Sequence, residues 1–152
     1  MKVSTSIPRM HADQHGFKHS ELSERLIGIF FGICNELGHG FLECVYEQAF
    51  AVALAEHGIF FQRQMAVPVY FHKQKIGDFR ADLLVDNKIL LELKTGRDID
   101  PSWEKQLLNY LPATEVEVGL LLNFGPQAQF KRYIFENDRK IRVNLRESAE
   151  KK

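Results

Sequence analysis

Residues 80–95, RADLLVDNKILLELKT, contain two short apolar segments separated by the polar triplet Asp86-Asn87-Lys88. Apolar runs of this length on either side of Asp and Asn are typical of two β-strands joined by a tight turn. Three charged residues lie inside these segments: Asp82, Glu92 and Lys94. A charge inside a half-buried strand is costly unless it is paired or binds a metal. These three residues are therefore the first candidates for a functional site.

The register of this hairpin decides whether the two acids meet. Glu92 and Lys94 are two residues apart, so they point to the same face of their strand. If the triplet is a three-residue loop, Val85 pairs with Ile89 and Asp82 lies opposite Glu92. The same register gathers an apolar set on the other face, consisting of Leu83, Val85, Ile89, Leu91 and Leu93. A two-residue loop would separate the acids and scatter the apolar set, so we expect the three-residue loop.

Two carboxylates that face each other across a strand pair repel, and a divalent cation removes that repulsion. Oxygen ligands favour Mg²⁺ or Mn²⁺ over metals that prefer thiolates. Such an ion can polarise a phosphoryl oxygen and acidify a bound water, while Lys94 can orient that water or offset negative charge. The alternative is a salt-bridged strand pair in which Lys94 only neutralises one of the acids, Asp82 or Glu92.

The rest of the chain predicts an α/β fold. Apolar periodicity indicates helices from residue 20, with Ser20 as the N-cap, to Gly38 or Gly40, and over residues 42–57. Strands are expected over residues 59–71, 78–85, 89–94, 116–124 and 130–135. Residues 72–77 are expected to form a turn, and a third helix is expected to begin at Pro101. Pro68 suggests an edge strand or a bulge. The predicted order is helix, helix, three strands, helix, strand, strand.

Size and charge restrict the class of protein. A chain of 152 residues fits one domain, which we place at residues 19–140, with a flexible leader over 1–18 and a charged tail over 141–152. Lys plus Arg equals Asp plus Glu, 20 each, which counts against tight, non-specific binding to duplex DNA. No apolar run reaches the roughly 20 residues of a membrane span. We therefore expect a cytoplasmic protein without a membrane partner.

Four motifs in order resemble the GxxExxY family of the PD-(D/E)XK nuclease superfamily. The motifs are Gly40-Phe-Leu-Glu43-Cys-Val-Tyr46, Asp82, the triplet Glu92-Leu93-Lys94, and Gln106-Leu-Leu-Asn-Tyr110. The resemblance covers residues 21–135, about three-quarters of the chain. It implies a restriction-endonuclease-like core, which is a mixed β-sheet flanked by helices in the order ααβββαββ.

The resemblance also implies roles for these residues. Asp82, Glu92 and the backbone carbonyl of Leu93 would hold Mg²⁺ or Mn²⁺, and Lys94 would be the catalytic lysine. Glu43 matches a helical glutamate that often joins the metal site in this superfamily. Its position near a helix N-terminus leaves a second interpretation open, in which Glu43 only complements the helix dipole.

Four further residues are candidates for contact with substrate. Gln106 and Tyr110 match a QxxxY motif that supports the site and the nucleic-acid strand in exonuclease-like branches of the superfamily. Tyr46 shares a helix face with Glu43, and Arg80, two residues before Asp82, suits a phosphate contact. The alternatives are core tyrosines, a surface glutamine and a solvated arginine.

Three functions remain open at this stage. The first is a Mg²⁺-dependent nuclease in which Glu43, Asp82, Glu92 and Lys94 are catalytic and the substrate is nucleic acid, with DNA favoured over RNA. The second is a catalytically inactive binding or assembly module that keeps the nuclease fold. The third is an enzyme that acts on a small phosphorylated nucleotide. A homodimer would enlarge the binding surface in the first two cases.

Overall fold

The computed structural model describes residues 18–137. The tail predicted over 141–152, and all of the predicted leader except residue 18, lie outside the described residues. The helices and strands, in chain order, are α1 (Ser20–Leu37), α2 (Glu43–Glu56), β1 (Phe61–Phe71), β2 (Gln74–Val85), β3 (Ile89–Lys94), α3 (Pro101–Tyr110), the 3₁₀ turn η4 (Leu111–Ala113), β4 (Val118–Phe124) and β5 (Ala128–Ile134). This order confirms the predicted fold class.

The five strands form one mixed sheet with the spatial order β1-β2-β3-β4-β5. β3 and β4 are parallel, and the other neighbouring pairs are antiparallel. The crossover from β3 to β4 contains α3, as a parallel connection requires. β4 is buried along its whole length. β1 is an edge strand that carries Pro68, and its pairing with β2 is irregular between Val69 and Tyr70, so the prediction from Pro68 is confirmed.

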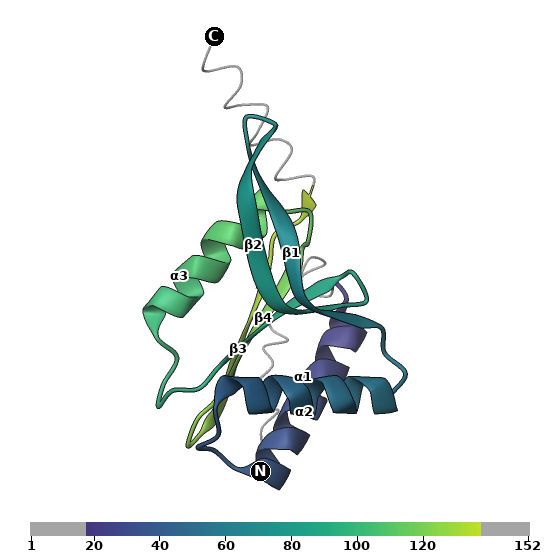
Figure 1. The fold of residues 1–152 in the computed structure, drawn as a ribbon, viewed down its shortest axis with the longest axis vertical. Helices are drawn as coiled ribbons and strands as arrows, with labels where there is room; N and C mark the ends of the chain where they lie inside the picture. Colours follow the sequence, from purple (N-terminus) through teal and green to yellow (C-terminus); the bar gives the residue numbers. More distant parts are fainter. Residues whose placement is uncertain (1–17, 138–152) are drawn as a thin grey trace.

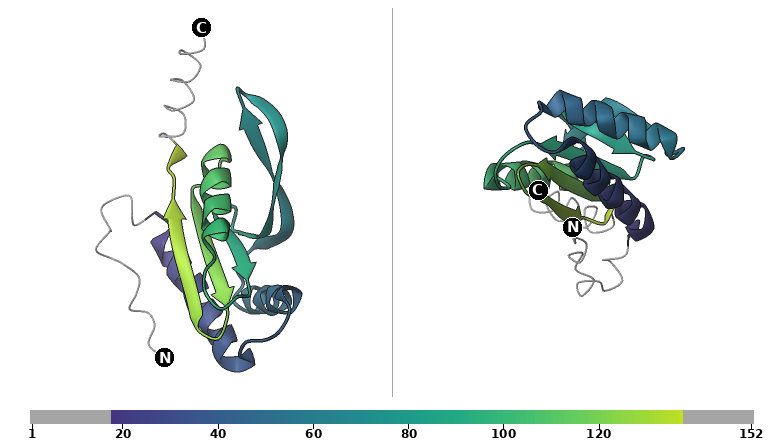
Figure 2. Two further views of the ribbon diagram at one scale, coloured as in Figure 1. Left: turned by 90° about the vertical axis from the view of Figure 1, so that its left-hand side faces the viewer. Right: turned by 90° about the horizontal axis from the view of Figure 1, so that it is seen from below.

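Helices cover both faces of the sheet (Figures 1 and 2). α1 and α2 pack on one face, where their apolar residues join the set predicted from the hairpin register, namely Leu83, Val85, Ile89, Leu91 and Leu93. The other face carries a second, smaller core, in which Leu111 of η4 and Tyr110 of α3 pack against Leu84 and Leu90. The alternation of the hairpin residues between the two cores confirms the predicted register, in which Val85 pairs with Ile89.

Two local predictions were wrong. The turn expected over residues 72–77 contains only His72 and Lys73, both with positive φ (53° and 66°), and β2 begins directly after them at Gln74. Two consecutive residues of positive φ match the right-handed twist of a hairpin, and the resulting long β1–β2 hairpin projects from the sheet (Figure 1). The N-cap of α1 is His19, in the left-handed conformation and without a side-chain capping bond, rather than Ser20.

Within residues 18–137, no helix has both the length and the apolar character that a bilayer-spanning segment needs.

Candidate active site

The candidate site lies where β2 and β3 part. Their pairing runs from Val85↔Ile89 to Leu83↔Leu91, and Asp82 and Glu92 come next on the two strands. The Leu93 N–H donates a hydrogen bond of 2.8 Å to Oδ2 of Asp82, and the Asp82 N–H donates to the Glu92 carboxylate. Each acid therefore takes the place of a backbone carbonyl at the end of the ladder, which brings the two carboxylates together as predicted.

The two faces of β2 exchange at Asp82. Leu83 belongs to the core under α1 and α2, whereas Ala81, also an odd-numbered residue, belongs to the second core. A regular strand keeps alternate residues on one face, so the strand rotates between these positions. The pairing with β1 passes from Arg63↔Leu83 to Met65↔Ala81 without pairing Asp82 and Gln64, and Gln64 has a φ of 51°. The acid thus sits at an irregularity in both strands.

Burial and mutual repulsion perturb the two strand acids. Glu92 is only 8% exposed, and burial, followed by the charge of Asp82, raises its pKa to about 8. Burial also raises the pKa of Asp82, while the hydrogen bond from Leu93 N–H opposes this rise. Oε2 of Glu92 is buried and lacks a hydrogen-bond partner within the described part of the chain. A buried carboxylate oxygen without a donor is costly, and it is the kind of atom that a cation satisfies.

Glu43 and Lys94 join the same electrostatic group. Desolvation raises the pKa of Glu43, the charges of Asp82 and Lys94 act on it, and the Thr95 N–H donates a hydrogen bond to its carboxylate. The pKa values of Glu43, Asp82 and Glu92 are all raised, mainly by burial, and the positive charge of Lys94 opposes the rise in each. Its Nζ lies 5.8 Å from the centre of the Trp103 ring, within reach of a cation–π contact. All four predicted catalytic residues therefore converge on one place.

Tyr46 is buried beneath the loop that precedes α2. Its side chain is 0% exposed and stacks on Phe124 with ring centroids 4.3 Å apart. Its hydroxyl donates to the Gly38 carbonyl at 2.7 Å and accepts from the Phe41 N–H at 3.3 Å. In this arrangement Tyr46 shapes the loop that leads to Glu43, and it offers no surface to a substrate.

The other three predicted substrate residues lie on β2 and α3. Arg80 is exposed, and its Nη1 donates to the Gln64 carbonyl at 2.7 Å. Gln106 is exposed on α3, three residues after Trp103 and hence on the same side of the helix. Tyr110 stacks on Phe79 with ring centroids 4.5 Å apart, as part of the second core.

Several residues around the site were not predicted. Glu47 lies one turn after Glu43, so its i,i+4 spacing could have identified it. Asn123 interrupts the apolar run of β4 and is 0% exposed; it holds Gly96, two residues after Lys94, through both backbone groups at 2.9 and 3.0 Å. Gln64 has no sequence signal, because glutamine rarely adopts the left-handed conformation.

A family model for the PD-(D/E)XK nuclease superfamily matches residues 20–133. The chain belongs to this superfamily. No curated protein matches the chain. Among solved structures, the protein SSO0001 is similar with a TM-score of 0.49 and 13% identity, over 90% of this chain and 66% of that one. An alkaline exonuclease from Laribacter hongkongensis is similar with a TM-score of 0.45 and 14% identity, over 84% of this chain and 80% of that one.

PD-(D/E)XK nucleases generally use divalent metal ions. Within residues 18–137, no three side chains of His, Cys, Asp or Glu lie close enough to hold an ion by themselves. The available set is two facing carboxylates and backbone oxygen, with one carboxylate oxygen of Glu92 buried and lacking a donor. An all-oxygen set of this kind fits Mg²⁺ or Mn²⁺, which leave coordination positions to water.

Proposed function

We propose that this protein is a Mg²⁺- or Mn²⁺-dependent nuclease of the GxxExxY type that hydrolyses phosphodiester bonds in nucleic acid, with DNA favoured over RNA. The observation that carries the proposal is the meeting of Asp82 and Glu92 where β2 and β3 part, with a buried Glu92 oxygen that lacks a donor among residues 18–137. A repelling acid pair costs stability, and a structural salt bridge would instead pair each acid directly with a cation.

The acids and the lysine of the site have separate proposed roles. Asp82 and Glu92, with the Leu93 carbonyl, would hold the ion, and Glu43 would complete the group from α2. The ion would supply Lewis acidity at a phosphoryl oxygen and lower the pKa of a water. Lys94, poised over Trp103, would orient that water and offset negative charge on the reacting phosphate.

Two exposed residues are the proposed contacts to substrate. Arg80 on β2 and Gln106 on α3 are both exposed, so we propose them as contacts to the phosphate backbone. Tyr46 and Tyr110, which are packed in the two cores, would support the site from below. Lys and Arg balance Asp and Glu over the chain, so binding would depend on a local arrangement of charge rather than on a strongly basic protein.

The test is cleavage of single- and double-stranded DNA and RNA in Mg²⁺ or Mn²⁺ by the wild type, Asp82→Asn and Lys94→Met. Matched controls lie in the same hairpin. Asp86 and Lys88 form an exposed ion pair of 3.3 Å at its turn, and Asn tolerates the positive φ of Asp86. We expect Asp86→Asn and Lys88→Met to cleave like the wild type, and the two site variants to lose at least about 100-fold in rate.

Cleavage that survives in both site variants would place the activity elsewhere or in a contaminant. Calorimetric titration with Mn²⁺ gives an independent measurement, in which Glu92→Gln should bind more weakly than the wild type. Metal binding without cleavage of any of the four nucleic acids would favour the other candidate, a non-catalytic module that keeps the fold.

A further inference from the structure

Gln64 has an unusual backbone for a residue inside a strand. It lies in β1 across from Asp82, with a φ of 51°, a left-handed conformation that residues with a Cβ seldom adopt. Nη1 of Arg80 donates to the Gln64 carbonyl at 2.7 Å and holds this conformation in place. Backbone strain of this kind persists only where surrounding contacts enforce it, and it is common at functional sites.

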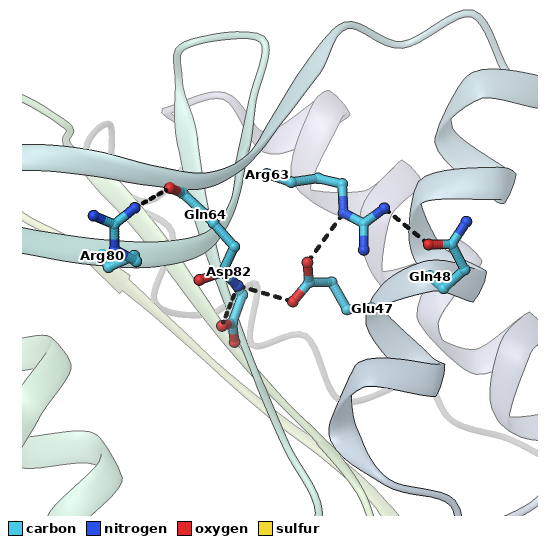
Figure 3. A network of polar contacts seen from close by, with 6 residues as sticks. All are labelled: Glu47, Gln48, Arg63, Gln64, Arg80 and Asp82. Carbon is cyan, nitrogen blue, oxygen red and sulfur yellow. Dashed lines mark hydrogen bonds and ion pairs between the residues drawn. The ribbon is translucent and has the colours of Figure 1, made fainter.

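This conformation directs the Gln64 side chain between two acids (Figure 3). Its Nε2 donates to Oε1 of Glu47 at 3.0 Å and reaches Oδ1 of Asp82 at 3.5 Å. The first contact is a firm hydrogen bond, and the second is at the long limit of one. An amide nitrogen only donates, so this one neutral group directs its two N–H bonds toward both acids.

Glu47, the acid on the α2 side of Gln64, is also held by a neighbour. Glu47 accepts a hydrogen bond of 3.0 Å from Nε of Arg63, and Nη1 of Arg63 donates to Gln48 at 2.8 Å. Glu47 and Gln48 belong to α2, the helix that begins with Glu43. The network therefore ties the helix that carries Glu43 to the strand that carries Asp82.

We propose that Gln64 is a positioning residue for the metal site, an assignment that rests on the proposed function. Asp82 has a contact at each oxygen: a firm hydrogen bond of 2.8 Å from the Leu93 N–H at Oδ2 and a longer contact of 3.5 Å from the Gln64 amide at Oδ1. Together the two contacts restrict rotation of the carboxylate and keep it facing Glu92. Residues that orient metal ligands in this way commonly affect metal affinity by tenfold or more.

The test separates positioning from plain stability with two variants at one position. Gln64→Gly removes the amide and relieves the left-handed strain, because glycine adopts positive φ freely. Gln64→Met removes the amide, keeps a side chain of similar length and keeps the strain. Urea unfolding should therefore place the glycine variant above the methionine variant in stability. Calorimetric Mn²⁺ titration should show affinity about tenfold below wild type in both.

Gln48→Ala is the control, because the Gln48 amide oxygen accepts its hydrogen bond from Nη1 of Arg63 rather than from Gln64, and we expect wild-type Mn²⁺ affinity from it. Wild-type affinity in Gln64→Gly would overturn the inference. The inference would also be overturned if the Mn²⁺ affinities of the two variants changed in parallel with their urea midpoints. That result would mean that Gln64 only stabilises the fold. Equal Mn²⁺ uptake by the wild type and Glu92→Gln is a different outcome, which removes the proposed metal site and this inference with it.

Discussion

Asp82 and Glu92 are bound to each other's strand. Asp82 accepts a hydrogen bond from the N–H of Leu93, the residue after Glu92, and Glu92 accepts one from the N–H of Asp82 itself. The two acids are thus held face to face by backbone donors at the end of the β2–β3 ladder. The two acids are close enough for the charge of Asp82 to add to the effect of burial and raise the pKa of Glu92.

Replacing Asp82 separates its charge from its structural contact. Asp82→Asn and Asp82→Ala both remove the charge, but only asparagine keeps an oxygen for the Leu93 N–H. A buried donor without an acceptor costs about 1–3 kcal/mol. We expect Asp82→Ala to be less stable than Asp82→Asn by about 1–2 kcal/mol in urea unfolding, with weakened Mn²⁺ binding in both. Equal stability of the two variants would contradict the hydrogen bond.

Glu92 should make the metal-free protein less stable at high pH. Its pKa is about 8 in the folded state, against 4.5 as the ordinary value. Between these values the folded protein binds the proton that the unfolded chain has released, so stability falls as pH rises through this window. Below about pH 4.5 both states are protonated and the effect vanishes. Glu92→Gln should flatten this dependence.

The measurement is urea unfolding of both proteins from pH 5 to pH 8.5 in the presence of a chelator. At the alkaline end we expect Glu92→Gln to be more stable than the wild type by about 1–3 kcal/mol. Glu36→Gln, a change of an exposed glutamate on α1, is a matched control that should keep the wild-type slope. A wild-type profile that rises over this range would contradict the raised pKa.

Metal binding should release protons, because the raised pKa of Glu92 leaves its carboxyl protonated until an ion displaces the proton. A carboxyl whose pKa is about 8 is largely protonated at pH 6.5, and a metal ligand must give up its proton. We expect Mn²⁺ affinity to rise between pH 6 and pH 8 and then to level off. Titrations at pH 6.5 in buffers of different ionisation enthalpy should report up to one released proton per ion, and no buffer dependence would mean that Glu92 is already ionised.

The sequence predicted the order of the elements and the register of the β2–β3 hairpin, because both depend on simple periodicity. Leu83 and Leu93 had to share a face with the rest of their apolar set, and only one loop length allowed this. That single requirement also placed Asp82 opposite Glu92. The predicted convergence of Glu43 came from the family resemblance, since no local pattern relates α2 to these strands.

The remaining errors have a common physical cause, which is the backbone conformation of individual residues. His72 and Lys73 form a tight turn with positive φ, and Gln64 interrupts β1 with the same conformation. Gln and Lys do not favour that region, and the enrichment of His there is too modest to identify a turn by itself, so composition does not reveal it. The exchange of faces at Asp82 is equally invisible, because it arises where two paired strands twist together.

Tyr46 should stabilise the loop before α2 through its hydroxyl. Tyr46→Phe removes a donor to the Gly38 carbonyl and an acceptor for the Phe41 N–H, while it keeps the stacked ring. We expect a loss of about 1–2 kcal/mol in the free energy of unfolding. Tyr110→Phe, which keeps the stack on Phe79, should change stability by less than about 0.5 kcal/mol. Equal effects would contradict a specific role for the Tyr46 hydroxyl.

The segment after Lys94 should be intolerant of change at Gly125. A Cβ at position 125 would overlap the Gly96 carbonyl oxygen, and this backbone cannot move aside easily because Asn123 holds Gly96 through both its N–H and its carbonyl. We expect Gly125→Ala to lower the free energy of unfolding by about 2 kcal/mol or more.

The same substitution should also slow Mg²⁺-dependent cleavage, because the shifted segment includes Thr95, whose N–H binds Glu43. Gly77→Ala is the matched control, since a Cβ on Gly77 meets no atom within 4 Å, and it should change stability by less than about 0.5 kcal/mol. Urea unfolding and single-turnover cleavage of both variants measure the two effects. A Gly125→Ala protein as stable as Gly77→Ala would show that the Gly96 segment moves aside freely, and a stable but slow variant would place the effect on Glu43 alone.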